Sequence, residues 1–328
     1  MKILVVRFSS IGDVVLTTPV VRCLKQQIPN CEIHFITKKA FKGILEHNSN
    51  ISKIFTIDSS ISEVIPALKE EKYDYVIDLH KNLRTFQLKN KLGRPSYSFP
   101  KLNFEKWILV NLKRNNMPKV HVVDRYFKAV EKLGVKNDNK PCDFFIQLSD
   151  EIQIKDHFNL TSEKYITIAI GAQFATKRMP FEKLKEIIEQ LNQSIILIGG
   201  ETDKTLADEI LAAFPNKTIF SACGIFSLAQ SASIVKQSRV LLSNDTGMMH
   251  IASCFQIPTI SVWGNTVPEL GMYPYFPENP EIFSIHEVKG LNCRPCSKIG
   301  FQKCPKGHFN CMNLQDSKVI GADILGKI

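Results

Sequence analysis

Residues 2–13 read KILVVRFSSIGD, and this stretch decides the fold. The first seven residues are a short apolar run rich in β-branched side chains, as in a buried strand. A Ser-Ser-x-Gly-Asp turn follows at once, and a helical pattern then runs from about Asp13 to Gln27. A strand that passes through a tight turn into a helix is the opening of a βαβ unit.

The same alternation continues outward from this unit. Further strands are predicted at residues 32–37, 52–58 and 74–80, and helices near 39–47, 61–71, 103–115 and 121–134. The pattern then restarts, with strands predicted at residues 165–172, 194–200, 218–224, 239–245 and 258–264. The helices between them are predicted from Pro180 onward and at residues 202–213, 227–238 and 246–255. Strands that alternate with helices predict an α/β fold with parallel, doubly wound sheets.

Two Rossmann-like domains are therefore expected, at residues 1–158 and 159–328. The segment 136–163 is polar and carries little pattern, which places the boundary near residue 158. The length of 328 residues also exceeds what one hydrophobic core usually holds. Two such domains would face each other across a ligand cleft lined by the carboxyl ends of both sheets.

Composition points to a cytoplasmic protein. No apolar run reaches the roughly 18 residues needed to span a bilayer. The first residues are too polar for a signal peptide, because Arg7 and a Gly-Asp pair follow the short apolar run. The nine cysteines are an odd number, and five lie scattered among apolar segments, so a disulfide framework is not expected.

The positive charge is concentrated in one part of the chain, which we call the basic segment, Lys81–Lys132. It holds thirteen lysines and arginines and three acids, a balance equal to the net charge of +10 of the whole chain. Such a field suits an anionic partner: a phosphorylated glycolipid, a membrane surface or a nucleic acid. Phe104, Trp107 and Ile108 fall on one predicted helical face beside these charges, as at a membrane interface. The alternative is a solvated basic surface with Trp107 packed into the core.

The first candidate site is the turn Ser9-Ser10-Ile11-Gly12-Asp13. Its small residues let a ligand approach the backbone where a strand meets a helix. It lacks both GxGxxG and the Walker lysine, so an ordinary dinucleotide or P-loop site is not indicated. Asp13 is either a helix-capping acid or a general base aimed into the cleft.

Three further candidates lie at strand ends in the second half. In Ser243-Asn244-Asp245-Thr246-Gly247-Met248-Met249-His250 the Asp-Thr pair would cap a helix whose N–H groups face an anion, with His250 one turn further on. Lys177 and Arg178 lie in a loop, either solvated or clamping a diphosphate leaving group. Glu201 follows Gly199-Gly200, where an acid often holds a ribose or base.

Taken together, these motifs resemble glycosyltransferase family 9, the ADP-heptose:lipopolysaccharide heptosyltransferases. The resemblance rests on MKILVVRFSSIGDVVLTTPVV, GAQFATKRMP, GGETD, SNDTGMMHIA and PTISVWGNT, in collinear order from about residue 1 to 315. It implies a GT-B fold and an inverting reaction that needs neither metal nor cofactor. The partners it implies are ADP-heptose, a lipopolysaccharide inner-core acceptor and, peripherally, the inner membrane.

The resemblance also assigns roles to single residues. Asp13 would be the catalytic base. The donor would be held by Lys177, Glu201, Asp245, Thr246, Gly247 and His250. The acceptor would be held by Ser9, Ser10 and Gly12, together with Lys81 and Arg84 of the DLHKNLR stretch that starts at Asp78.

Other functions stay open from the sequence. The same architecture could use another nucleotide-sugar for a surface polysaccharide, or serve a nucleotide-sugar epimerase, although an epimerase needs no acceptor or basic segment. A peripheral membrane adaptor would explain Trp107 but not Asp13. A nucleic-acid-binding protein would explain the charge, but no aromatic-rich motif supports one, so no nucleic-acid partner is expected.

The C-terminal region has a cysteine cluster, Cys293, Cys296, Cys304 and Cys311, with His308 among them. Four thiols within nineteen residues could bind a structural zinc ion. The spacing is not that of a zinc ribbon, because the second pair is too far apart. Reduced thiols in a packed loop are the favoured interpretation, and a catalytic metal is not expected in either case.

Overall fold

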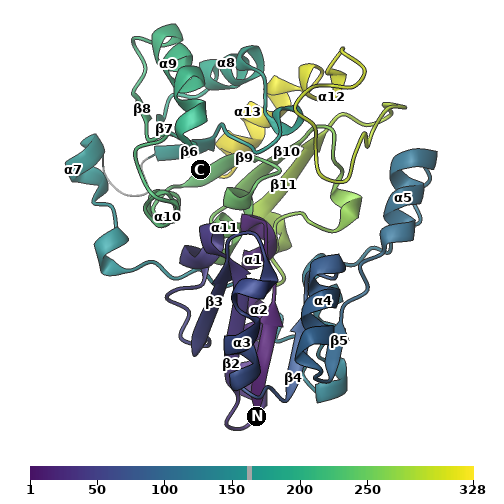
Figure 1. The fold of residues 1–328 in the computed structure, drawn as a ribbon. Helices are drawn as coiled ribbons and strands as arrows, with labels where there is room; N and C mark the ends of the chain where they lie inside the picture. The colour runs from purple at the N-terminus through teal and green to yellow at the C-terminus, as the bar shows by residue number, and fades with distance from the viewer. Residues whose placement is uncertain (161–164) are drawn as a thin grey trace. The chain divides into compact units, whose positions relative to one another are not determined.

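The structure, a computed structural model, describes residues 1–160 and 165–328 and contains two parallel β-sheets (Figure 1). Internal contacts divide the chain into two compact units, residues 1–102 with 120–145 and residues 103–119 with 146–328. The predicted division into two functional domains at residue 158 stays a prediction. The compact units differ from it in that residues 103–119 and 146–158 belong to the second unit. Residues 161–163 of the low-pattern segment lie outside the described residues.

The first unit is built on a five-stranded sheet. Its strands are β1 (Lys2–Val6), β2 (Glu32–Lys38), β3 (Lys53–Ile57), β4 (Tyr75–Asp78) and β5 (Ser96–Ser98). They are parallel and run in the order β3-β2-β1-β4-β5, so the chain reverses its winding direction between β1 and β4. Such a switch point opens a crevice at the carboxyl ends of the two strands, where α/β proteins bind ligands.

Short helices connect the strands of this unit. They are α1 (Ile11–Val15), α2 (Thr18–Gln27), α3 (Ile65–Glu70), α4 (Leu83–Leu92) and α6 (Val122–Phe127). The 3₁₀ segments are η1 (Lys39–Ile44), η2 (Ile61–Glu63) and η3 (Glu131–Leu133). The helical pattern predicted from about Asp13 to Gln27 forms two helices, α1 and α2, because Pro19 cannot donate to the carbonyl of Val15. The Thr18 hydroxyl donates to that oxygen instead, at 2.8 Å.

The second unit is built on a six-stranded parallel sheet. Its strands are β6 (Tyr165–Ala169), β7 (Ser194–Ile198), β8 (Ile219–Ser221), β9 (Val240–Asn244), β10 (Thr259–Trp263) and β11 (Phe283–Glu287). The order β11-β10-β9-β6-β7-β8 places a second switch point between β9 and β6. These strands read as apolar runs because helices cover both faces of the sheet.

The helices of the second unit, with the exception of α5, contribute to two buried apolar clusters around the sheet. The helices of this unit are α5 (Asn103–Leu112), α7 (Ile154–Phe158), α8 (Phe181–Glu189), α9 (Lys204–Ala213), α10 (Leu228–Lys236), α11 (Gly247–Cys254), α12 (Asn310–Asn313) and α13 (Ser317–Gly326). The 3₁₀ turns are η4 (Leu148–Asp150), η5 (Ala175–Lys177), η6 (Glu201–Asp203), η7 (Pro268–Leu270) and η8 (Pro280–Ile282). Helices α8, α9 and α13 share one buried apolar cluster with the sheet, and α7, α10 and α11 share another.

The doubly wound sheets confirm the predicted fold class. Within the described residues, every helix is too short or too polar to cross a membrane.

Candidate active site

Most of the predicted site residues lie at the two switch points, whereas Glu201 follows β7. In the first unit Asp13 follows β1 and the stretch from Asp78 follows β4. In the second unit Lys177 lies in the loop after β6 and Asp245 directly follows β9. Each pair therefore flanks the crevice at which a parallel sheet binds its ligand.

Asp13 lies in the first turn of α1, where Ser10 and Arg7 hold its carboxylate. Its Oδ2 accepts hydrogen bonds from the Ser10 backbone N–H at 3.2 Å and from the Ser10 hydroxyl at 2.8 Å. Its Oδ1 forms an ion pair with the Arg7 guanidinium. The side chain is nevertheless 20% exposed, so the carboxylate is both anchored and accessible. The helix-capping role and the role of a base are thus compatible in this geometry.

Arg7 was not predicted as a site residue, although it belongs to the quoted strand. Its Nε donates to the Ser9 carbonyl at 2.8 Å and its Nη1 to the Leu79 carbonyl at 2.5 Å, so it ties together the turns after β1 and β4. Burial opposes the guanidinium charge, but the Asp13 carboxylate together with Tyr126 and Asp78 outweighs it, and the pKa of Arg7 is raised. The signal in the sequence that could have identified Arg7 is an arginine inside an apolar run, since buried arginines are almost always paired.

The turn after β4 is organised by the buried Asp78. Its carboxylate accepts the backbone N–H groups of His80 and Lys81, at 3.1 and 2.7 Å, and pairs with Lys89 at 2.9 Å. Burial would raise the pKa of Asp78, but these donors outweigh it and lower that pKa. The carboxylate therefore shapes the turn and leaves the residues after it to face a ligand.

His80 is a second residue that the sequence did not single out. Its imidazole packs edge-on against the Phe8 ring, with the centroids 5.4 Å apart. Its Nδ1 is buried without a hydrogen-bond partner among the described residues. Burial, together with the charges of Arg7 and Lys101, lowers the pKa of His80 to about 4. The side chain is a neutral group beside the Asp13 cluster.

The predicted acceptor residues all belong to the first unit. Lys81 donates through Nζ to the Phe99 carbonyl at 3.1 Å, and the Arg84 guanidinium lies 5.7 Å from the centroid of the Phe8 ring. Phe8 thus contacts both Arg84 and His80, which brings the β4 turn beside the β1 turn. Ser9 contributes its carbonyl to Arg7, and Gly12 is buried in α1.

In the second unit Lys177 and Asp245 contact each other directly. The Lys177 ammonium lies 2.6 Å from Asp245 Oδ2, which also accepts the Thr266 hydroxyl at 2.8 Å. The loops after β6, β9 and β10 are thereby linked through one carboxylate. At the β10 loop the approach is so close that a Cβ on Gly264 would lie 2.6 Å from the Thr176 carbonyl oxygen.

The remaining predicted donor residues are Thr246, Gly247, His250 and Glu201. Thr246 is the N-cap residue of α11, with Gly247 as the first helical residue, but its side chain makes no capping hydrogen bond; its hydroxyl lies 3.2 Å, oxygen to oxygen, from that of Ser243. His250 is buried on the same helix. Glu201 is exposed at the end of β7 and pairs only with Lys204 among the ion pairs of the described residues, at 2.8 Å. The positions of these residues are compatible with the predicted donor-binding roles, which stay predictions.

Arg178 stands apart from the Lys177 link. Its Nε donates to the Ala172 carbonyl at 2.8 Å, and its Nη1 lies 3.3 Å from Asp203. Arg178 therefore braces the loop after β6, and Lys177 is the cation beside the β9 turn.

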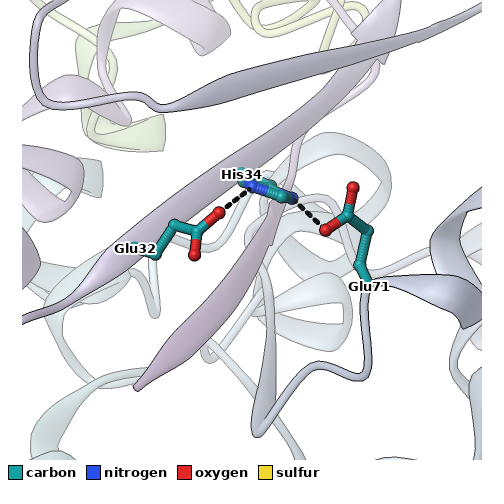
Figure 2. A group of neighbouring side chains, drawn as sticks. All are labelled: Glu32, His34 and Glu71. Carbon is teal, nitrogen blue, oxygen red and sulfur yellow. Dashed lines mark hydrogen bonds and ion pairs between the residues drawn. The ribbon is translucent and has the colours of Figure 1, made fainter.

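A cluster at the opposite, amino ends of the first sheet has the residue types of a metal site. Figure 2 shows His34 between Glu32 and Glu71, with Nε2 2.8 Å from Glu32 Oε1 and Nδ1 3.8 Å from Glu71 Oε2. Lys2 and Lys53 pair with Glu71 at 2.8 and 2.6 Å and lower its pKa to about 2. Two lysines already balance the two carboxylates, so the cluster is a salt-bridge network that fastens strand ends.

Comparisons with known proteins agree with this architecture. Lipopolysaccharide heptosyltransferase 1 of Campylobacter coli is 25% identical over 296 residues, covering 81% of this chain and 84% of the relative. The structure of a family 9 glycosyltransferase from Veillonella parvula is similar with a TM-score of 0.70 at 24% identity, covering 87% and 85% of the two chains. An E. coli heptosyltransferase solved with ADP is similar with a TM-score of 0.68 at 20% identity over 100% of both chains.

The two structural likenesses span both sheets and confirm the predicted GT-B fold. The family model described as glycosyltransferase family 9 (heptosyltransferase) matches residues 61–299, well over half of the sequence. The match takes in the β4 turn and every predicted donor residue. This chain therefore belongs to glycosyltransferase family 9 and is a glycosyltransferase.

Proposed function

We propose that this enzyme transfers a heptose from ADP-heptose to a lipopolysaccharide inner-core acceptor, with inversion at the anomeric carbon and without a catalytic metal. Support comes from the name of the C. coli relative and from the ADP in the E. coli structure. Each unit carries polar residues of the required kind at its own switch point. The donor chemistry is assigned to the second unit and the acceptor chemistry to the first.

On the donor side the leaving group is a diphosphate whose negative charge grows as the glycosidic bond breaks. Lys177 and the N–H groups at the start of α11, next to Thr246 and Gly247, stabilise that charge. His250 and Asp245 line the rest of the donor site. Asp245 and Glu201 bind the hydroxyl or amino groups of the nucleoside. The fixed cation and helix end take the place that a divalent ion has in other phosphate sites.

On the acceptor side a hydroxyl must lose its proton as it attacks the sugar. Asp13 accepts that proton as a general base, and Arg7 and Ser10 hold its carboxylate in place. Lys81 and Arg84 bind anionic groups of the acceptor. Ser9, Ser10 and Gly12 line the acceptor site beside Asp13. Such an acceptor is anchored in a membrane, and we propose that the basic segment meets it at the inner membrane surface.

The observation that carries the proposal is the state of Asp13. Capping alone needs only the contacts to Ser10, yet this carboxylate is also paired with a buried arginine and left partly exposed at a switch point. A carboxylate placed in this way is preorganised for proton transfer.

The test is turnover with a panel of ADP-, UDP- and GDP-sugars and a delipidated inner-core acceptor, followed by mass spectrometry and by NMR of the new anomeric centre. We expect transfer from ADP-heptose and an inverted product. Asp13→Asn should lower kcat by about 10²- to 10⁴-fold, because the amide cannot take the proton, while ADP affinity stays within about twofold. Asp58→Asn, at the end of β3 in the same sheet, is the matched control and should keep full turnover.

Two results would contradict parts of the proposal separately. Transfer from a UDP-sugar alone would replace the donor and leave the base in place. Wild-type turnover by Asp13→Asn would reduce Asp13 to a helix cap.

A further inference from the structure

Arg294 lies in the loop after β11, and its guanidinium is buried against the turn after β10. Its side chain is only 6% exposed. A guanidinium has five N–H groups, and five oxygen atoms of the second unit lie within 3.4 Å of its nitrogens, so each group has an acceptor. The five are the carbonyl oxygens of Trp263, Gly264, Thr266 and Val288, at 3.4, 2.5, 2.8 and 3.2 Å, and Glu287 Oε2 at 2.7 Å. Arg294 therefore joins the ends of β10 and β11 through one side chain.

Most of these contacts fall on the β10 turn, residues 263–266, through which the chain leaves β10. Three of the four carbonyls belong to this turn. A planar guanidinium offers its donors in a fixed fork, so it fixes the peptide groups that it binds more closely than a single flexible donor would. Glu287 in turn holds the guanidinium and balances its buried charge. The β10 turn is thus shaped around Arg294.

The β10 turn is connected to the predicted donor site through Thr266. The carbonyl of Thr266 accepts from Arg294, and its hydroxyl donates to Asp245 Oδ2 at 2.8 Å. The same carboxylate oxygen pairs with the Lys177 ammonium at 2.6 Å. The side chains of Lys177 and Asp245 are 16% and 11% exposed, so this ion pair is only weakly screened. A chain of polar contacts therefore runs from Arg294 to Lys177.

The neighbours of Arg294 also brace the loop that carries Lys177. The Phe301 N–H donates to the Thr176 hydroxyl at 2.8 Å, and that hydroxyl donates to the Phe301 carbonyl at 2.9 Å. Residues 294–301 therefore contact the loop after β6 as well as the β10 turn.

We propose that Arg294 is a positioning residue of the donor site: it sets the place of the Lys177 ammonium, and thereby the affinity for a nucleoside diphosphate. It acts through Thr266 and Asp245, since its own N–H groups each have an acceptor within the protein. The inference rests on the proposed function, in which Lys177 binds the leaving diphosphate, and it adds the residue that holds this cation in place. Such placement matters, because a charged group displaced by about 1 Å loses much of its effect.

The competing account is that Arg294 only stabilises the fold of the second unit. The two accounts differ in one measurable respect. An effect on nucleotide affinity that runs through Lys177 disappears once Lys177 has been replaced, whereas a general loosening of the unit lowers the affinity with or without it.

The first experiment is a double-mutant cycle of Arg294→Gln and Lys177→Ala in the full chain, with the affinity for ADP, UDP and GDP measured by calorimetry. Arg294→Gln should lower the affinity for the bound nucleotide about 5-fold in the wild-type background, but less than about twofold beside Lys177→Ala. Equal losses in the two backgrounds would overturn the proposal. The control is Arg239→Gln, which removes an exposed arginine of the same unit that donates to the Ile328 carbonyl at 2.5 Å, and it should leave the affinity unchanged.

A second variant, Thr266→Val, tests the same path should Arg294→Gln not fold. Valine keeps the shape of threonine and removes the hydroxyl that binds Asp245. It should lower the nucleotide affinity about 3-fold with Lys177 present and leave it unchanged in Lys177→Ala. Unchanged affinity of Thr266→Val in the wild-type background would overturn the proposal.

Two readouts keep this inference apart from the proposed function. Hydrogen exchange needs no nucleotide, and Arg294→Gln should speed the exchange of the backbone N–H groups of residues 263–267. Unchanged exchange there would overturn the proposal. Binding of UDP or GDP in place of ADP, with the same dependence on Lys177, would instead correct the donor in the proposed function and support the positioning role.

Discussion

At the scale of single residues, His80 couples the site to pH. Its pKa of about 4 follows from burial and from the positive charges of Arg7 and Lys101, which Asp13 and Asp78 offset only in part. In the unfolded chain an imidazole titrates near 6.5. Between these two values the unfolded chain binds a proton that the folded protein refuses, so the free energy of unfolding falls as the pH falls.

His80→Gln should therefore make the protein less sensitive to acid. Glutamine keeps hydrogen-bonding groups but cannot be protonated. Between pH 7.5 and pH 5 the wild type should lose about 2 kcal/mol more unfolding free energy than the variant, as measured by urea denaturation. His157→Gln, at an exposed position in α7, is the control and should lose as much as the wild type. Equal losses in wild type and His80→Gln would show that the imidazole is not kept neutral by folding.

At the scale of elements, the ion pair of Lys177 and Asp245 joins the loop after β6 to the end of β9 across the switch point. This partly buried pair is 2.6 Å long. In the proposed mechanism it would position the lysine for the diphosphate, and Asp245 would offset the lysine charge until the donor binds. The same contact therefore positions the cation and links two strand ends.

Lys177→Ala should lower ADP affinity by about 10-fold and kcat/KM by about 100-fold, since a charged donor to the leaving diphosphate is lost. Lys177→Arg should restore part of both. Calorimetry with ADP and initial rates with the nucleotide-sugar give the two values. The control is Lys183→Ala in α8, which removes a lysine that is paired with Glu186 at 2.8 Å. Unchanged ADP affinity in Lys177→Ala would exclude the diphosphate contact.

The sequence predicted most of these elements because long buried strands leave a strong pattern. All strands of five residues or more except β11 overlap a predicted one, and the turns after β1, β6 and β9 lie where the motifs placed them. The strands β5 and β11 escaped because SYS and FSIHE are too short or too polar to stand out. The break between α1 and α2 needed the role of Pro19 and Thr18, which a count of apolar spacing does not register.

The site was predictable only in part for a similar reason. Asp13, Lys177 and Asp245 lie inside motifs, but Arg7 and His80 are defined by their three-dimensional neighbours. The partner of Asp13 is six residues away in the sequence, and His80 lies on a different strand end. Spacing along one chain cannot reveal that two turns share a buried arginine.

At the scale of the whole molecule, positive charge and exposed apolar side chains are concentrated in the same segment of the chain. The net charge of the basic segment equals the net charge of +10 of the whole chain, and parts of the segment belong to both compact units. Six of the fifteen exposed large apolar side chains of the described residues also lie in it: Leu83, Phe86, Phe104, Trp107, Leu112 and Val120. The alternative in which Trp107 packs into the core is wrong, because Trp107 is 53% exposed and Leu109 is the residue of α5 that is buried.

Helix α5 therefore has the composition of a membrane-interface element. Phe104 is 70% exposed, and Lys106 and Arg114 stand near the apolar positions in sequence. Aromatic rings partition into the boundary between headgroups and acyl chains, and each nearby cation adds about 1 kcal/mol of attraction to anionic lipid. Lys113 is left unchanged in the vesicle experiment, because its ammonium also donates to the carbonyls of Cys293 and Pro295.

We expect the protein to co-sediment with anionic vesicles at low salt and to dissociate at high salt, because the attraction between exposed charges is screened. Lys106→Glu with Arg114→Glu should weaken binding to anionic vesicles by at least about 10-fold. Lys39→Glu with Lys69→Glu changes the net charge equally, outside the basic segment, and should have a smaller effect. Phe104→Ser with Trp107→Ser should weaken binding at every salt concentration, since apolar insertion is not screened. Equal loss in the two charge-reversed proteins would mean that net charge alone draws the enzyme to the membrane and that α5 is not the docking element.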